Sequence, residues 1–331
     1  MPKVYYDKDA DLNVLKKKTI AIVGYGTQGR AQALNLRDSG LNVIIGQRKG
    51  PSFKQAKADG FDPMPVDEAS KKADFIQILL PDELMADIYN DQIAPAVKKG
   101  KTLSFSHGFN IHFGQIVPPA DVNVVMIAPK GPGTLVRTQF EEGRGVPNLI
   151  AIQQDADKAA KKQALAYAKG IGGTRAGVFE TSFREETESD LFGEQAVLCG
   201  GVTRLMQTGF QVLVDAGYSP EIAYFECIHE MKLIIDLVVE KGFEGMRSAI
   251  SNTAEFGDLT KGDLVIDEYV RENMEDLLDA IQRGEFAREW ILENKAGRPV
   301  FRALKQQASE HLSEKTGQKL RAMMPWLKKK K

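Results

Sequence analysis

Short apolar runs separated by polar, helix-like segments fill the first half of the chain. Each run is too short for a helix and is flanked by turn-forming or charged residues, so we expect buried strands. The segments between them have the length and patterning of crossover helices. The expected strands cover residues 18–23, 41–45, 74–80, 102–106, 122–128, 148–152 and 174–178. This alternation predicts an α/β fold with a Rossmann-like, doubly wound, mostly parallel sheet.

The strand pattern stops near Thr181, and helical patterns fill the second half. Ser219 and Pro220 suit the start of a helix that is apolar almost all round to about residue 240, so we expect it to be buried. Other helices are expected at 185–215, 244–251, 267–282, 286–295 and 316–324, with irregular pieces at 242–246 and 250–257. We predict a dinucleotide-binding domain at 1–181, an all-helical domain at 182–327 and a basic tail at 328–331.

Composition narrows the classes of function. The 44 Lys and Arg residues balance 45 Asp and Glu residues, which gives no reason to expect a nucleic-acid or membrane partner. Two cysteines suit neither a disulfide framework nor a zinc site. No signal peptide and no bilayer-spanning apolar run is apparent. We expect a soluble, cytoplasmic protein.

The first expected strand runs directly into Gly24-Tyr-Gly-Thr-Gln-Gly29 and then into a helix. This is the Gly-x-Gly-x-x-Gly motif in the strand–turn–helix context that binds a pyrophosphate at a helix N-terminus. The alternative is a tight turn without a ligand. We predict dinucleotide binding at this turn.

The end of the next strand normally selects the cofactor. An acid there would bind the ribose 2′-hydroxyl of NAD, but residues 46–52 contain none. Arg48 is suited to bind a 2′-phosphate, and Ser52 to donate a hydrogen bond to it. The alternative is that Arg48 and Lys49 are only exposed turn charges. We predict a preference for NADPH.

Two chemically active side chains follow later strands. His107 comes after the strand at 102–106, and Lys130 comes after the strand at 122–128. Each alone is more often structural than catalytic. Ligands gather at the carboxyl ends of strands in open α/β sheets, so together they are candidates for an active site beside the nucleotide turn.

Two pairs of acids recur at helical spacing in the second half. Asp190 and Glu194 form the first pair, and Glu226 and Glu230 form the second. Residues four apart share a helix face, where like charges repel unless a cation lies between them. The alternative is a solvated acidic face, but Glu226 and Glu230 interrupt the apolar stripe of Ile222, Leu233 and Leu237. Carboxylate ligands suit magnesium or manganese.

Together these motifs resemble the ketol-acid reductoisomerases, also called acetohydroxyacid isomeroreductases, in their short form. The matching segments span nearly the whole chain in the family's order. They are residues 24–29, 106–112, 126–133, 185–195, 223–230, 250–255 and 284–287. The resemblance implies two steps: a magnesium-assisted alkyl migration in 2-acetolactate or 2-aceto-2-hydroxybutyrate, then reduction by NADPH to the dihydroxy acid on the valine and isoleucine pathway. Such chemistry needs a nucleotide domain facing a metal domain.

The resemblance also implies roles for individual residues. Asp190 would bridge two Mg²⁺ ions, Glu194 would complete the ligands of one, and Glu226 and Glu230 would hold the other. Glu194 would also act as acid or base near the reduced carbonyl. The catalytic residues would also include Lys130 and His107, and the role of His107 stays open. Ser251 would contact the substrate carboxylate. The implied NADP(H) contacts are Tyr25, Gly26, Thr27, Gln28, Arg48, Ser52, Asp82, Glu83, Leu84, Met85 and Gly133.

Short-form members have knotted, intertwined helical domains. By resemblance, the partner subunit would supply Glu226, Glu230 and Ser251, so a homodimer with a shared active site is implied. Assembly beyond the dimer stays open. Sequence rules alone would not propose a knot, because knots are nearly absent from proteins.

Two other functions remain as alternatives. A metal-independent NADP-dependent hydroxyacid dehydrogenase with Lys130 as general acid would explain the first half of the chain, but not the acid pairs. A non-catalytic NADP-binding sensor would bind nucleotide without turnover. Insensitivity to EDTA would favour the dehydrogenase, and binding without turnover the sensor.

Overall fold

The structure is a computed structural model that describes residues 2–324. Its internal contacts divide the chain after Ser189, within helix α9 (Phe183–Phe192). The boundary predicted at 181/182 lies just before this helix. The basic tail predicted at 328–331 and the last residues of the predicted helical domain lie outside the described residues. The two units are described separately below.

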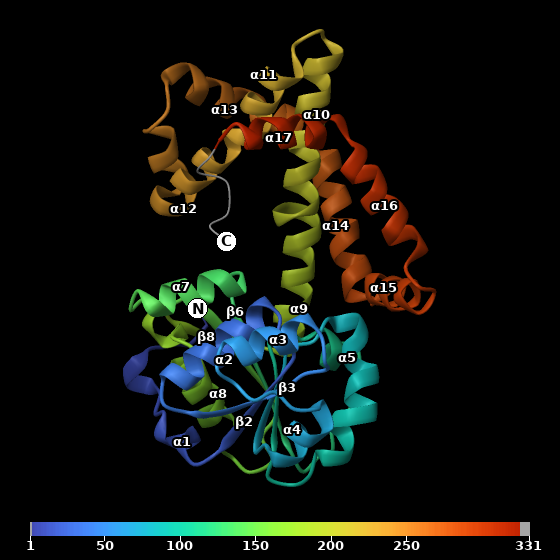
Figure 1. The fold of residues 1–331 in the computed structure, drawn as a ribbon. Coiled ribbons are helices and arrows are strands. Elements are labelled where there is room, and N and C mark those ends of the chain that lie inside the picture. The colour runs from blue at the N-terminus through green and yellow to red at the C-terminus, as the bar shows by residue number, and fades with distance from the viewer. Residues whose placement is uncertain (1, 325–331) are drawn as a thin grey trace. The chain divides into compact units, whose positions relative to one another are not determined.

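The first unit is built on an eight-stranded sheet of order β1-β8-β7-β6-β5-β4-β2-β3 (Figure 1). Strands β3, β2, β4, β5 and β6 are mutually parallel, whereas β7 runs antiparallel to β6, and β1 antiparallel to β8. The mixed, largely parallel sheet confirms the predicted fold class. The strands are β1 (Val4–Tyr5), β2 (Thr19–Val23), β3 (Asn42–Gly46), β4 (Phe75–Ile78), β5 (Thr102–Phe105), β6 (Asn123–Pro129), β7 (Asn148–Gln154) and β8 (Val178–Glu180).

One strand prediction needs correction, and one strand was missed. The strand expected at 174–178 begins only at Val178, because Gly172 adopts a left-handed φ of 90° and Gly173–Arg175 form a 3-10 turn. Strand β1 was not expected, since two paired residues leave no periodic signal. It pairs Val4 with Phe179 at the sheet edge.

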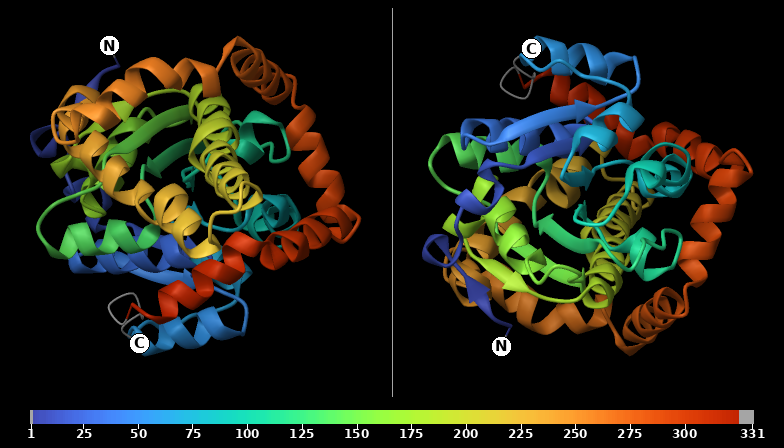
Figure 2. Two further views of the ribbon diagram at one scale, coloured as in Figure 1. Left: turned by 90° about the horizontal axis from the view of Figure 1, so that it is seen from above. Right: turned by 90° about the horizontal axis from the view of Figure 1, so that it is seen from below.

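Helices cover both faces of the sheet, and its strands pass between them in the view from below (Figure 2). One apolar cluster joins the sheet to α1, α2 and α8, and another joins its opposite face to α4 and α5. Both faces are thus buried, as the apolar runs predict. The helices are α1 (Asn13–Lys16), α2 (Thr27–Asp38), α3 (Pro51–Ala58), α4 (Val66–Lys72), α5 (Asp82–Ile88), α6 (Phe109–His112), α7 (Gly133–Glu141) and α8 (Ala160–Gly170), with short turns η1 (Asp7–Asp9), η2 (Tyr89–Ile93), η3 (Ala94–Ala96) and η4 (Gly173–Arg175).

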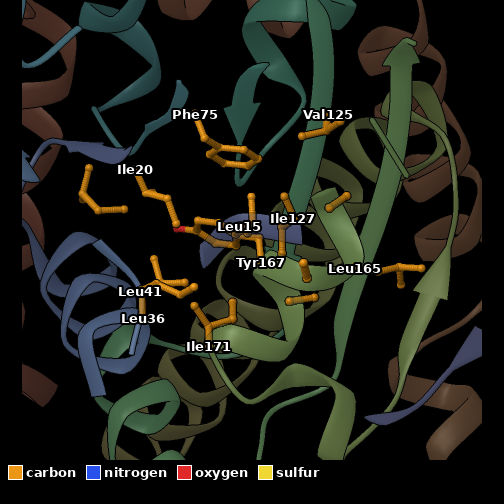
Figure 3. Close-up of a cluster of buried hydrophobic side chains, with 14 of the residues drawn as sticks. Leu15, Ile20, Leu36, Leu41, Phe75, Val125, Ile127, Leu165, Tyr167 and Ile171 are labelled. Atoms are coloured by element: carbon orange, nitrogen blue, oxygen red, sulfur yellow. The ribbon is translucent and has the colours of Figure 1, made fainter. Parts of the chain in front are cut away.

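The first cluster centres on Tyr167 of α8 and Phe75 of β4 (Figure 3). Their rings stack with centroids 5.2 Å apart and planes 14° from parallel. Tyr167 is fully buried, and its hydroxyl donates a hydrogen bond to Oε1 of Gln32, 2.7 Å away. Burial of each such aromatic side chain contributes about 2–3 kcal/mol. This core fixes α8 and α2 against the sheet whose carboxyl edge carries the site.

The second unit is helical. In the left view of Figure 2, α14, α15 and α16 follow one another from orange to red. Within the described residues the unit consists of the rest of α9, η5 (Gly193–Leu198), α10 (Gly200–Asp215), α11 (Pro220–Tyr224), η6 (Phe225–His229), α12 (Met231–Arg247), α13 (Asn252–Val265), α14 (Glu268–Gln282), α15 (Glu285–Lys295), α16 (Pro299–Glu310) and α17 (Leu312–Ala322).

Several local predictions for this unit are wrong. The segment expected to be irregular at 250–257 begins helix α13, for which Ser251 is the N-cap: its Oγ accepts a hydrogen bond from the N–H of Ala254 at 3.2 Å. Helix α16 was missed. The linker expected at 242–246 is a helix interrupted only at Gly242, whose φ of 73° breaks α12 locally.

The helix expected to be buried up to residue 240 is largely exposed in the single chain. Within α12, Leu233 is 56% exposed and Val239 is 80% exposed. The helix is apolar as predicted, but residues 2–324 of one chain leave much of its apolar surface exposed. None of the helices described in residues 2–324 has the length and apolar character needed to cross a membrane.

Candidate active site

The glycine turn between β2 and α2 is shaped by close backbone approaches. Gly24 adopts a φ of 96°, and a Cβ there would lie 2.4 Å from the carbonyl oxygen of Leu79. A Cβ on Gly29 would lie 2.0 Å from the carbonyl oxygen of Gly24. At Gly26, by contrast, a Cβ would meet nothing within 4 Å. The open space lies at the N-terminus of α2, where a pyrophosphate can accept hydrogen bonds from backbone N–H groups.

A second loop, after β6, packs against the glycine turn. Nε2 of Gln28 donates a hydrogen bond to the carbonyl oxygen of Gly131 at 2.8 Å. A Cβ on Gly133 would lie 2.3 Å from the carbonyl oxygen of Thr27, so only glycine permits this contact. The structure therefore brings together Thr27, Gln28 and Gly133, three of the expected cofactor residues.

The other expected cofactor residues lie at the carboxyl ends of β3 and β4. Arg48 follows β3 and is exposed, and Ser52 is half-buried in the first turn of α3. Residues 82–85 form the first turn of α5, where the carbonyl oxygen of Asp82 accepts a hydrogen bond from Nδ2 of Asn110 at 3.1 Å. Met85 is 3% exposed and belongs to the core, whereas residues 82–84 are half-buried, so they and the backbone of this turn are what a nucleotide could contact.

His107 and Lys130 meet at one buried carboxylate. They follow the neighbouring parallel strands β5 and β6, and both contact Glu186 of α9. Nδ1 of His107 lies 3.3 Å from Oε1 of Glu186, and Nζ of Lys130 donates to the same oxygen at 3.3 Å. The backbone N–H of Gly108 donates to Oε2 at 3.0 Å. The structure thus brings His107 and Lys130 together at the carboxyl edge of the sheet.

The electrostatics of this cluster favour an ionised Glu186, which is 1% exposed. Burial alone would raise the pKa of Glu186. The hydrogen bond and charge of His107, the charge of Lys130 and the Gly108 N–H outweigh that effect, so its pKa lies below the ordinary value. A buried carboxylate with these partners can hold an imidazole and an ammonium in fixed positions.

Sequence reasoning did not identify Glu186 as a site residue. It lies in the motif at 185–195 among several acids, of which Glu188 is also buried, and only its contacts with His107 and Lys130 set it apart. One signal was available: Glu186 precedes Asp190 by four residues on α9, which is one helical turn. Close packing also fixes its position, because a Cβ on Gly108 would lie 2.2 Å from Oγ1 of Thr187.

A buried polar network supports the loops from below. Oγ of Ser106, next to His107, donates to the carbonyl oxygen of Ile127 at 2.8 Å and lies 3.0 Å from Nε2 of Gln77 and 3.3 Å from Nε2 of Gln32. Gln32 also donates to Oε1 of Gln28 at 3.2 Å. Gln32 and Gln77 are fully buried. The network ties the turn that carries His107 to the glycine turn.

In the second unit, both predicted acid pairs lie at π-helical turns. Glu194 is the second residue of η5, four residues after Asp190, and Glu226 is the second residue of η6, which Glu230 directly follows. Such π-turns inside helices occur frequently at functional sites. Glu194, Glu226 and Glu230 are exposed, as is Ser251. Carboxylate oxygens such as those of the three glutamates are ligands that Mg²⁺ prefers.

One chain does not gather these acids into a site. Within residues 2–324 of the single chain, no three of Asp190, Glu194, Glu226 and Glu230 approach closely enough to share a cation. The described residues of one chain therefore do not build a metal site from these four acids alone.

Several solved structures share this fold. A putative oxidoreductase from Jannaschia sp. is 17% identical, covers 80% of this chain and 97% of its own, and has a TM-score of 0.60. A semialdehyde dehydrogenase NAD-binding protein from Cupriavidus necator is 19% identical, with 79% and 99% of the two chains covered and a TM-score of 0.57. At these identities the likeness concerns the fold alone.

Other matches identify the family. The model of the NADPH-binding domain of acetohydroxy acid isomeroreductase matches residues 14–177, and that of the ketol-acid reductoisomerase C-terminal domain matches residues 183–326. An NADH-preferring ketol-acid reductoisomerase from an uncultured archean is 50% identical, covers 97% of this chain and 98% of its own, and has a TM-score of 0.94. With both family models in sequence order along one Rossmann-like unit and one helical unit, this chain belongs to the ketol-acid reductoisomerase family.

Proposed function

We propose that this chain performs its family's isomeroreduction with two Mg²⁺ ions and NADPH, in an active site that a second copy of the chain completes. The ketol-acid reductoisomerase activity itself, in branched-chain amino acid biosynthesis, follows from the family. The observation that carries the catalytic part of the proposal is the buried carboxylate of Glu186, which holds His107 and Lys130 at the carboxyl edge of the nucleotide-binding sheet. The substrates are 2-acetolactate and 2-aceto-2-hydroxybutyrate.

The metal part of the proposal rests on the two acid pairs. Asp190 would bind both Mg²⁺ ions. Glu194 would complete the protein ligands of the first ion, and Glu226 and Glu230 those of the second. When bound, the two cations supply Lewis acidity that polarises the hydroxyl and keto oxygens of the substrate. The π-turns at Glu194 and Glu226 support this assignment, because they place both acids on locally widened helices.

The chain's own residues would handle protons and position. Lys130, held by Glu186, presents an ammonium group that can donate a proton or orient a water molecule. His107 is oriented by the same carboxylate through Nδ1, which leaves Nε2 as its other polar atom. Glu194 would exchange the proton at the reduced carbonyl, and the hydroxyl of Ser251 would bind the substrate carboxylate, a role beyond its observed one as a helix cap.

The choice of NADPH rests on the segment after β3. It carries Arg48 and Ser52 and has no acid at the position that would bind a ribose 2′-hydroxyl. The solved relative at 50% identity prefers NADH, so family membership alone does not fix the choice. Arg48 is exposed, and a guanidinium can bind a 2′-phosphate through two parallel hydrogen bonds.

The dimer explains two features of the single chain. Apolar side chains on α12 and α13 are exposed, including Val239 at 80% and Phe256 at 68%. Exposed apolar surface on this scale is typical of an obligate interface. In a dimer with intertwined, knotted helical domains, the partner subunit would cover this surface. It would also complete the site by supplying its own Glu226, Glu230 and Ser251.

The test is NADPH oxidation with 2-acetolactate, followed by nicotinamide absorbance, with Mg²⁺ and again with EDTA. We expect magnesium-dependent turnover, with a higher kcat/KM for NADPH than for NADH. Turnover that survives EDTA would overturn the metal assignment, and a preference for NADH would overturn the role of Arg48. Sedimentation of the active enzyme as a monomer would overturn the shared site.

A further inference from the structure

We propose that Tyr25 is a positioning residue for cofactor recognition, whose backbone and side chain together clamp both ends of residues 47–59. These residues, here called the β3–α3 segment, carry Arg48 and Ser52 and lie between the end of β3 and the C-cap of α3. The clamp would set the discrimination between NADPH and NADH, and this part rests on the proposed role of Arg48.

The side chain of Tyr25 lies in the core and not on the surface of the glycine turn. The residue is 3% exposed, and its ring packs edge-on against Phe61 with centroids 5.9 Å apart. Its hydroxyl donates a hydrogen bond to Oδ2 of Asp59 at 2.9 Å. Burial and this bond raise the pKa of the phenol well above its usual value, so the hydroxyl keeps the proton that it donates. A nucleotide would contact the backbone of Tyr25, whereas the buried phenol binds Asp59 in the interior of the protein.

Asp59 anchors the far end of the β3–α3 segment. Arg30 of α2 donates to both of its carboxylate oxygens, from Nε at 2.7 Å and from Nη2 at 2.8 Å. Gln55 of α3 donates to Oδ1 at 3.1 Å, and Arg37 donates to the backbone carbonyl oxygen at 2.6 Å. The hydrogen bond from Arg30 holds the pKa of Asp59 below its usual value. The end of α3 is therefore tied to α2 and to the glycine turn at once.

Gln47 anchors the near end of the same segment. Its side-chain Oε1 accepts a hydrogen bond from the backbone N–H of Tyr25 at 2.9 Å. Its own backbone N–H donates to the carbonyl oxygen of Met64 at 2.9 Å. The N–H of Tyr25 thus binds the first residue of the β3–α3 segment, and the hydroxyl of Tyr25 binds the last.

The clamp has a direct consequence for binding. Arg48 and Ser52 lie between the two anchors, so the position of both relative to the glycine turn depends on Tyr25. A dinucleotide places its pyrophosphate at that turn and its adenosine ribose at the β3–α3 segment. Holding the two subsites at a fixed separation before binding removes an ordering cost that would otherwise weaken affinity. Loss of the clamp should therefore weaken binding of NADPH more than binding of NADH, because only NADPH has a 2′-phosphate that contacts the β3–α3 segment.

The test compares Tyr25→Phe with Arg48→Gln and with the double variant, in the full chain. Dissociation constants for NADPH and NADH are measured by calorimetry, with the thermal unfolding midpoint as a second readout. A hydrogen bond to a charged partner is lost in Tyr25→Phe, so we expect NADPH to bind about tenfold more weakly and NADH about twofold. In the Arg48→Gln background, Tyr25→Phe should weaken both dinucleotides equally.

Tyr5→Phe is the matched control. The hydroxyl of Tyr5 also donates to an ion-paired carboxylate, Glu180, at 2.6 Å, and Lys161 binds that carboxylate at 2.8 Å. Tyr5 is 6% exposed, but it lies on β1, at the edge of the sheet opposite β3. Tyr5→Phe should lower the unfolding midpoint by as much as Tyr25→Phe and leave both dissociation constants unchanged.

The outcomes separate the clamp from the proposed role of Arg48. If Tyr25→Phe lowers the unfolding midpoint but changes neither dissociation constant, Tyr25 is only structural and the clamp is wrong. If Arg48→Gln leaves the NADPH-to-NADH ratio unchanged while Tyr25→Phe weakens both dinucleotides, Tyr25 still positions the segment for binding, but Arg48 does not bind the 2′-phosphate. If Tyr25→Phe weakens NADPH and NADH binding equally while Arg48 is intact, the clamp does not contribute to the discrimination between them.

Discussion

Nζ of Lys130 and Nδ1 of His107 both lie 3.3 Å from the same oxygen, Oε1 of Glu186. The two side chains come from the ends of different strands, and the shared carboxylate comes from α9. Glu186 is 1% exposed and the side chain of His107 is 19% exposed, so water screens their contact little, whereas the side chain of Lys130 is 36% exposed and its contact is partly screened. One buried acid therefore positions both candidate catalytic groups.

Replacing Glu186 by glutamine should reduce turnover much more than substrate binding. The amide keeps the shape but loses the charge that holds Lys130, so we expect kcat to fall about 100-fold or more, within the range of lost acid–base catalysis. The KM values for both substrates should change far less. Steady-state kinetics with NADPH and 2-acetolactate measure the split.

Glu185→Gln provides the control for this prediction. Glu185 is exposed on the same turn of α9 and accepts a hydrogen bond from Oγ1 of Thr181. It should keep full activity. Equal losses in both variants would show that α9 tolerates no change in charge here, and a fully active Glu186→Gln enzyme would remove Glu186 from the site.

Two glycines of the nucleotide turn should respond differently to alanine. A Cβ on Gly26 meets open space, and Gly26 has an extended backbone with a φ of −81°, so Gly26→Ala should fold normally. Its methyl group would occupy the space meant for the pyrophosphate, so we expect dinucleotide affinity to fall about 10- to 100-fold. Thermal unfolding tests whether Gly26→Ala folds normally, and calorimetric titration with NADPH tests whether its affinity falls.

Gly29→Ala is the contrasting variant. Its Cβ would lie 2.0 Å from the carbonyl oxygen of Gly24, so the turn itself must distort. We expect a loss of stability of several kcal/mol, beyond the usual range for a surface substitution. A Gly26→Ala enzyme that binds NADPH normally would mean that the pyrophosphate does not approach this glycine.

The sequence predicts the nucleotide half well because its signals are local. Buried strands, a glycine turn and polar residues at strand ends mark the edge where Thr27, His107 and Lys130 lie. Glu186 escaped because burial depends on packing from distant segments, such as the turn at Gly108. The two-residue strand β1 escaped because it is defined only by its pairing with β8.

The helical half shows where sequence patterns become ambiguous. Asn252 starts a helix that the glycines at 257 and 262 obscure, because isolated glycines argue against helix by propensity alone. The apolar character of α12 is visible in the sequence, but its partner is not. A pattern of apolar residues predicts that a surface is covered, and cannot state whether the same chain covers it.

His112 should make stability depend on pH near neutrality. Nε2 of His112 lies 3.3 Å from Oε1 of Glu188, and its side chain is 19% exposed. Burial lowers the pKa of His112 from its usual value, and Glu188 offsets this only in part. Because the unfolded chain then binds the proton first, the neutral ring contributes stability above about pH 6.5. That stability is lost as the pH falls through the lower folded-state pKa.

NMR titration of the His112 ring tests the pKa directly. Denaturant unfolding at about pH 7.5 and about pH 5.5 tests its consequence. His112→Gln should lose less stability than the parent between these two conditions. Glu188→Gln removes the offsetting charge, so it should lower the pKa of His112 further. A pKa at or above the usual histidine value would contradict the prediction.

The last prediction concerns Asp190, which lies four residues after Glu186 on α9. If Asp190 bridges two Mg²⁺ ions, Asp190→Asn deprives both of a charged ligand, and both the migration and the reduction should fall by at least about 100-fold. NADPH affinity should stay within about twofold of the parent, because the glycine turn and the β3–α3 segment are unchanged. The reduction is assayed separately by supplying the rearranged 2-keto intermediate, and NADPH binding by calorimetry. Glu221→Gln, an exposed acid in the first turn of α11, serves as the control and should be fully active. If Asp190→Asn retained either step at the parental rate, the bridging role would fall, and Glu194 would have to hold its metal with other ligands.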